Sequence, residues 1–85
     1  MLGYIMSEAT YQAKIIKRLE KEGYYVLKLI KTNKNGIPDI LALKDGEKPL
    51  FIEVKGKMTP ISPLQEYRIK ELNEQGFIAK IDREK

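Results

Sequence analysis

The chain has 85 residues, of which 42% are hydrophobic and 33% are charged, and this balance predicts a single globular domain spanning residues 1–85. It contains no cysteine and no histidine, which excludes disulfides, thiolate metal sites, histidine general bases and most zinc sites. The formal net charge of +4 weakly favours a polyanionic partner.

Any metal ion bound by this chain needs oxygen ligands, which favours Mg²⁺, Mn²⁺ or Ca²⁺. A chain this short buries a modest core, so dimerisation would stabilise it, and an apolar lead-in at residues 1–6 suits such a contact. No apolar run approaches the roughly 20 residues that cross a bilayer, and the lead-in is too short for a signal-peptide core. We therefore expect a cytoplasmic protein with no membrane partner.

The first predicted element is a helix over residues 8–22, with Ser7 as its N-cap and Gly23 as its stop. Its sheet-facing stripe, at helical spacing, consists of Glu8, Gln12, Ile15 or Ile16, and Leu19. Glu8 stands at the N-terminal end of this stripe, where an acid also suits the helix dipole. Spacing alone favours that structural role.

A strand over residues 24–30 follows, rich in β-forming residues. The loop at 31–36 is polar and basic, with Lys31 and Lys34. Its asparagines and glycine fit a solvated turn. Its charge fits a loop that contacts phosphates equally well, so both interpretations stay open at this point.

Two short apolar strands, 38–43 and 50–55, are joined by a turn over residues 44–48 that contains an Asp-Gly pair. Each strand opens at a proline, which lacks an N–H and belongs at a strand start or edge. This pattern predicts a β-hairpin in the middle of the chain.

Three ionisable residues interrupt these two apolar strands. Glu53 and Lys55 share a face because side chains alternate with a period of two. Pairing Leu43 with Pro49 places Asp39 opposite Glu53, and any register that keeps both apolar faces in the core leaves the two acids on one face. The hairpin therefore predicts a patch of two acids and a lysine.

The loop after this hairpin carries Lys57, and Ser62 then begins a second helix that is predicted to end near Gln75. Pro63 suits the first helical position, and Gln65 completes a capping box with Ser62. The residues expected to point inward are Leu64, Ile69 and Leu72. A final strand is predicted over residues 77–81, and the polar tail 82–85 is expected to be loose.

Together these elements predict an α/β fold, a small mixed β-sheet flanked by helices in the order α-β-β-β-α-β. The last helix should return the chain to a strand that lies parallel to its neighbour, through a right-handed crossover.

The acidic patch allows two interpretations. Two neighbouring carboxylates repel each other unless a cation lies between them, and Mg²⁺ is held by one or two protein carboxylates with waters and phosphate oxygens. Asp39 and Glu53 fit that role, the Val54 carbonyl could add a ligand, and Lys55 could activate a water or neutralise transition-state charge. Alternatively, Glu53 and Lys55 form an ion pair on a solvated face while Asp39 caps a turn. The general base stays open between Lys55 and a metal-bound hydroxide.

Three short motifs carry a resemblance to a known family, namely Gly36-Ile37-Pro38-Asp39, Ile52-Glu53-Val54-Lys55-Gly56 and Ser62-Pro63-Leu64-Gln65. The spacing from Pro38-Asp39 to Glu53-Val54-Lys55 resembles the PD-(D/E)XK nuclease signature. The three motifs together are similar to the VRR-NUC family, short stand-alone versions of which occur in phages and bacteria. The resemblance covers residues 8–81 and implies a restriction-endonuclease-like core.

The resemblance also implies roles for single residues. Asp39 and Glu53 match metal-binding acids, the Val54 carbonyl matches a backbone ligand, and Lys55 matches the catalytic lysine. Glu8 matches an acid on the first helix that completes the metal site. The remaining expected site residues are Gln65, as a catalytic residue near the scissile phosphate, and Lys31, Lys34 and Lys57, as DNA-binding residues.

From this resemblance we expect a Mg²⁺- or Mn²⁺-dependent DNA endonuclease in the cytoplasm of a bacterium or of a phage-infected cell. Branched DNA is the expected substrate, and a Holliday-junction resolvase acting as a homodimer is the narrowest form of this expectation. The alternatives are a flap or other structure-specific nuclease, a non-catalytic nucleic-acid-binding module, and a small protein-interaction or toxin–antitoxin domain whose acids form a solvated face.

Overall fold

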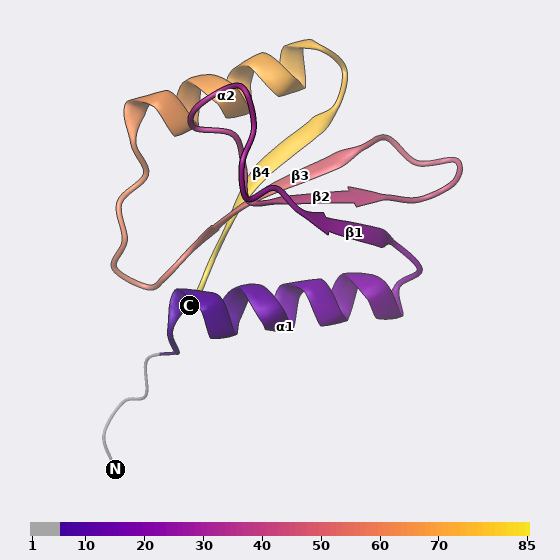
Figure 1. Ribbon diagram of the computed structural model, residues 1–85, viewed down its shortest axis with the longest axis horizontal. Coiled ribbons are helices and arrows are strands. Elements are labelled where there is room, and N and C mark those ends of the chain that lie inside the picture. Colours follow the sequence, from indigo (N-terminus) through magenta and orange to yellow (C-terminus); the bar gives the residue numbers. More distant parts are fainter. Residues whose placement is uncertain (1–5) are drawn as a thin grey trace.

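The computed structural model describes residues 6–85, which form two helices and four strands (Figure 1). In chain order these are α1 (Glu8–Lys21), β1 (Tyr25–Lys28), β2 (Ile40–Leu43), β3 (Leu50–Lys55), α2 (Pro63–Glu74) and β4 (Ile78–Arg83). The predicted α-β-β-β-α-β order is therefore confirmed. The apolar lead-in, apart from Met6, lies outside the described residues.

The four strands form one mixed sheet in the order β1-β2-β3-β4. The pairs β1–β2 and β2–β3 are antiparallel, whereas β4 runs parallel to β3, as the crossover through α2 predicted. Ile40 pairs with Ile52, which is the predicted hairpin register. Asp39 and Glu53 are the next residues outward from this pair, so they lie opposite each other.

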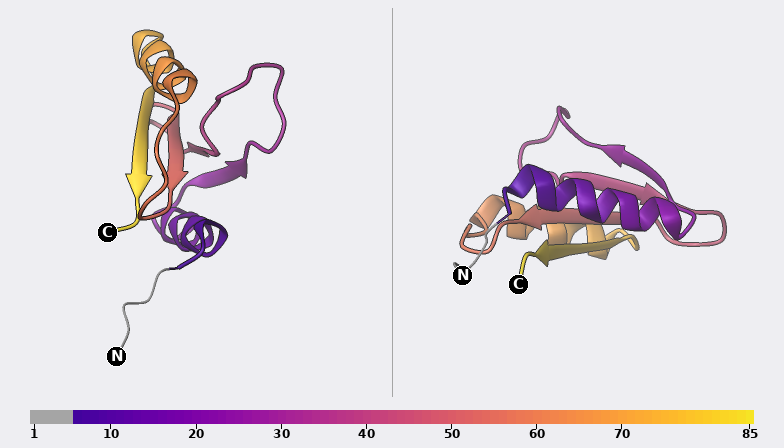
Figure 2. Two further views of the ribbon diagram at one scale, coloured as in Figure 1. Left: turned by 90° about the vertical axis from the view of Figure 1, so that its left-hand side faces the viewer. Right: turned by 90° about the horizontal axis from the view of Figure 1, so that it is seen from below.

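The side chains of β2 and β3 alternate between the two faces of the sheet, so the core and the site lie on opposite faces. One face carries the buried residues Ile40, Ala42, Ile52 and Val54, which pack against Ile15 and Leu19 of α1. The sheet lies between the two helices, with α1 on this apolar face and α2 beside β4 (Figures 1 and 2). Glu53 and Lys55 therefore project from the face turned away from α1.

Both helix starts have the predicted caps. The Ser7 side chain accepts a hydrogen bond from the backbone N–H of Thr10. Ser62 and Gln65 form the full capping box, in which each side chain accepts from the other residue's backbone N–H. No helix among residues 6–85 is long and apolar enough to span a membrane.

The prediction of a loose tail at residues 82–85 is wrong. β4 continues to Arg83 because all six residues of β3 find a parallel partner, ending with Lys55 beside Arg83. Asp82 then accepts a hydrogen bond from the Tyr11 hydroxyl of α1, and Glu84 is buried. These stabilising contacts are polar, so the apolar pattern of the sequence did not reveal them.

Three further boundaries or orientations differ from expectation. β1 covers only Tyr25–Lys28 of the predicted 24–30, and β2 begins at Ile40, after Pro38 and Asp39. Leu64 was expected to point inward but is 41% exposed. It lies at the first turn of α2 beside Gly36, where a Cβ atom would stand 2.7 Å from the Leu64 Cγ atom.

Candidate active site

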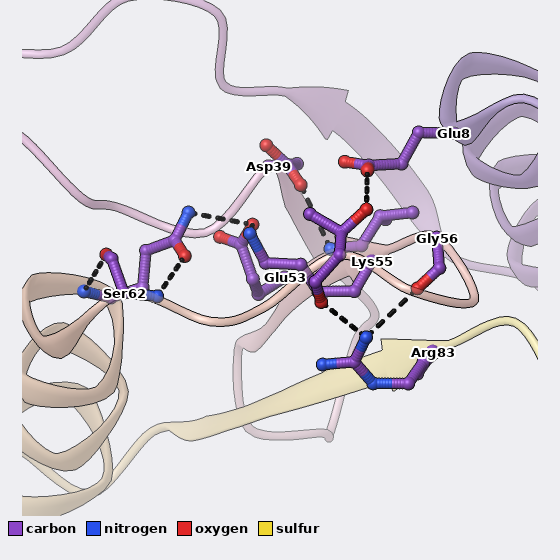
Figure 3. Close-up of polar contacts among 10 residues, drawn as sticks. Glu8, Asp39, Glu53, Lys55, Gly56, Ser62 and Arg83 are labelled. Atoms are coloured by element: carbon purple, nitrogen blue, oxygen red, sulfur yellow. Dashed lines mark hydrogen bonds and ion pairs between the residues drawn. The ribbon is translucent and has the colours of Figure 1, made fainter.

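Asp39, Glu53 and Lys55 meet where β2 begins and β3 ends. Glu53 and Lys55 are 3% and 6% exposed, although both are ionisable. The Lys55 Nζ atom lies 3.6 Å from the Glu53 Oε2 atom. Figure 3 shows this group between Ser62 at the start of α2 and Glu8 on α1. The predicted patch is therefore formed, with Glu53 and Lys55 buried and Asp39 half-buried.

Asp39 is held against the neighbouring strand by a backbone contact. Its Oδ2 atom accepts a hydrogen bond of 2.9 Å from the Val54 N–H group. This bond fixes the Asp39 carboxylate beside Glu53, which precedes Val54 on β3. The predicted role of the Val54 carbonyl as a metal ligand stays a prediction.

Gln65 connects the start of α2 to this group. Its Oε1 atom accepts from the Ser62 N–H at 3.0 Å, which caps the helix. Its Nε2 atom donates to the Glu53 Oε2 atom at 3.2 Å. One side-chain amide therefore serves the cap with its oxygen and contacts the acidic patch with its nitrogen.

Glu53 is the site residue whose ionisation is least favourable. Burial, and then the charge of Asp39, raise the pKa of Glu53 from 4.5 to about 7, while Lys55 opposes the rise. Its Oε1 atom is buried and has no hydrogen-bond partner within residues 6–85. A free carboxylate oxygen beside a second carboxylate is a donor set that fits a hard divalent cation such as Mg²⁺ or Mn²⁺.

Glu8 lies at the edge of the group. Its Oε2 atom accepts a hydrogen bond of 3.0 Å from the Thr59 hydroxyl. Within the described chain, no three acids converge closely enough to form a ready-made metal cage. Asp39 and Glu53 already match the one or two carboxylates that Mg²⁺ takes from a protein, so the contribution of Glu8 as a third ligand stays a prediction.

The three expected DNA-binding lysines are exposed. Lys31 and Lys34 lie in the loop between β1 and β2, and Lys57 lies in the turn after β3. The first loop is held to α2 because Arg68 donates to the Asn35 carbonyl at 2.9 Å. It therefore lies beside the helix whose first turn carries Gln65. The role of these lysines in phosphate contact stays a prediction.

Arg83 is a supporting residue that the sequence analysis missed. Its guanidinium donates to the carbonyls of Gly56 and Thr59, the two ends of the turn that follows Lys55 (Figure 3). Thr59 in turn donates to Glu8. The sequence pattern predicts a loose tail at this position, whereas extending the parallel register of β4 along all of β3 places Arg83 beside Lys55.

The comparison with protein families identifies the chain over nearly its full length. A model of the VRR-NUC domain matches residues 6–83, which include every residue of the acidic patch. None of the curated proteins compared with the chain matches it.

Proposed function

Since the chain belongs to the VRR-NUC family of nuclease domains, we propose that it is a Mg²⁺- or Mn²⁺-dependent DNA endonuclease that hydrolyses phosphodiester bonds. The observation that carries this proposal is that buried Glu53 and Lys55 lie beside half-buried Asp39, with one Glu53 oxygen left without a partner among residues 6–85. Burying an acid beside a second acid costs free energy that folding alone does not explain. A site that binds a cation and a phosphate explains it.

Each side chain has a distinct role in this proposal. Asp39 and Glu53 hold the divalent ion, which when bound supplies Lewis-acid stabilisation and a water of lowered pKa. The Lys55 ammonium, beside Glu53, faces the position where negative charge develops on the scissile phosphate. The Gln65 amide nitrogen orients Glu53 and can reach the same phosphate through its second N–H.

We further propose that branched DNA is the substrate, with four-way junctions cut by a homodimer. Resolving a junction needs two symmetric cuts, and a twofold dimer supplies two sites. Exposed apolar side chains on β1 support this assembly, because Tyr25 and Leu27 project from the sheet face turned away from α1 and are 68% and 38% exposed. Covering them with a second copy would enlarge a small core.

A cleavage assay tests the nuclease proposal. Labelled four-way junction, flap, nicked duplex and linear duplex are incubated with Mg²⁺, Mn²⁺ or EDTA. We expect cuts that require metal, strongest on branched DNA, and at least a hundredfold slower in Asp39→Asn and Lys55→Ala, since each removes a group that stabilises the transition state. Lys48→Ala, in the exposed turn before β3, is the matched control.

Two outcomes would count against the proposal. Full cleavage by Asp39→Asn would place the chemistry elsewhere. DNA binding without cleavage under either metal would favour a binding module on a nuclease fold.

A further inference from the structure

The outer face of α1 carries a row of cations that the proposed chemistry does not use. Lys14, Lys17, Arg18 and Lys21 recur at intervals of three and four residues, so they form one stripe on the helix. Ile15 and Leu19 face the core, whereas these four cationic side chains are exposed. The four side chains line one shallow hollow.

The stripe gathers four of the chain's 16 basic residues on one helix. Among residues 6–85, only Arg18 of the four forms an ion pair, with Asp82 at 3.3 Å. Lys14, Lys17 and Lys21 are exposed and make none. Arg18 and Lys21 lie in the last turn, where cations favour the helix dipole, whereas Lys14 and Lys17 have no such role and lie beside like charges, which repel each other.

The stripe leads away from the candidate active site. Glu8, at the site edge, begins α1, and a rise of 1.5 Å per residue places Lys14 about 9 Å and Lys21 about 20 Å further along the helix axis. A second hollow joins Lys14 and Lys17 to Lys28 on β1, and its lining is otherwise mainly apolar, with Glu20 at its side. From Lys14 to Lys21 the row of cations is about 10 Å long, which is comparable to about three base pairs of duplex DNA.

We propose that Lys14, Lys17 and Lys21 bind the phosphate backbone of a duplex arm that leaves the acidic patch past the N-terminal end of α1, where Glu8 borders the site. This inference rests on the proposed nuclease function. Evenly spaced lysines with no aromatic side chain among them suit a repeating polyanion, whereas protein interfaces are rich in aromatic anchors. Lysine ammonium groups neutralise phosphates without reading bases, so the contact is independent of sequence and positions the duplex.

The test compares two triple variants of equal charge. Lys14→Gln/Lys17→Gln/Lys21→Gln removes the proposed contacts and leaves Arg18 with Asp82. Lys48→Gln/Lys70→Gln/Lys85→Gln removes three exposed lysines elsewhere. Binding of a fluorescent four-way junction is measured by anisotropy over a range of salt concentrations, with Asp39→Asn added to every protein to prevent cleavage. Circular dichroism checks that both variants fold.

We expect the slope of log K against log salt to fall in magnitude by about 3 in the stripe variant, since each phosphate contact contributes about 0.9. Affinity at 0.1 M salt should fall by roughly tenfold or more, and the control variant should change by much less on both measures. With Asp39 restored, the stripe variant should show a raised KM and a kcat within about twofold of the parent, because the stripe does not touch the reacting phosphate.

Equal slopes for the two triple variants, with a parent that cleaves DNA, would overturn the stripe and leave the nuclease proposal standing. A parent that cleaves no DNA, combined with the expected loss of slope in the stripe variant, would overturn the nuclease proposal and retain the phosphate-binding surface.

Discussion

At the scale of single residues, Glu53 determines how the site responds to pH. Its side chain is buried beside Asp39, and its pKa is raised to about 7. Between the ordinary pKa of 4.5 and this value, the folded protein holds a proton that the unfolded chain has released. Stability is therefore greatest at low pH and falls as the pH rises through this window, in contrast to a carboxylate that is stabilised by an ion pair.

The first prediction concerns this window. In EDTA, the free energy of unfolding of the parent should fall between pH 5 and pH 8 by an amount on the order of 1–3 kcal/mol. Glu53→Gln should remove most of this dependence, because a neutral amide does not titrate in this range. Urea unfolding at pH 5 and pH 8 measures the free energy of unfolding of each protein, and Glu47→Gln, at an exposed position, is the control. A parent whose stability is the same at pH 5 and pH 8 would contradict the interpretation.

At the scale of elements, the end of β4 supports the turn that follows β3. Arg83 donates hydrogen bonds to the carbonyls of Gly56 and Thr59, and the Thr59 hydroxyl donates to the Glu8 carboxylate. A side chain from the last strand thus links the site's central strand to the first turn of α1. We interpret Arg83 as a positioning residue for the edge of the site.

The second prediction follows from this link. Arg83→Leu should lower the free energy of unfolding by about 1.5–3 kcal/mol, because it leaves carbonyls without a charged donor. It should also raise the Mg²⁺ concentration needed for half-maximal cleavage. Arg83→Lys should recover part of both effects through a single hydrogen bond, whereas Lys80→Leu on the same strand should change neither. If Arg83→Leu lowers stability without altering the Mg²⁺ requirement, the link is purely structural.

At the scale of the whole molecule, the two faces of the sheet are covered unequally. α1 packs on β1 and β3, and α2 packs beside β4, so within residues 6–85 neither helix packs against the outer face of β1. Tyr25 and Leu27 occupy that face. We therefore place the proposed dimer contact there.

The third prediction tests this contact. The parent should have the mass of a dimer in solution at micromolar concentration, and Tyr25→Glu/Leu27→Glu should have the mass of a monomer, because burying two added charges opposes association. Light scattering measures both, and Lys28→Glu, which points to the opposite face, is the control. A monomeric parent would remove the support for junction resolution by a dimer.

The sequence predicted those parts of the molecule whose signals are local. Alternation along 38–43 and 50–55, with an Asp-Gly turn, was sufficient to place Asp39 opposite Glu53. Ser62 and Gln65 predicted their own capping box. Spacing in the sequence could not predict the hydrogen bond from Gln65 to Glu53, because that contact depends on how α2 packs beside the sheet.

The part of the fold that was missed is the end of the chain. Arg83 and Glu84 carry no apolar pattern, so their order depends on partners far away in the sequence. The Glu84 N–H donates to the Lys55 carbonyl, and its carboxylate accepts from Met6. Such long-range polar contacts leave no periodic signal in either segment.

β3 pairs with β4 along its whole length and with β2 through Leu50–Ile52, and its side chains alternate between the core and the site, with Ile52 and Val54 on one face and Glu53 and Lys55 on the other. The backbone that presents the acid and the lysine is thus the backbone that holds the hydrophobic interior together. The site should open only when the whole domain opens, as one cooperative unit. The amide hydrogens of Glu53 and Lys55 should therefore exchange with solvent as slowly as that of Ile52. Substituting these side chains can remove activity, whereas local unfolding of β3 alone should not occur before the whole domain unfolds.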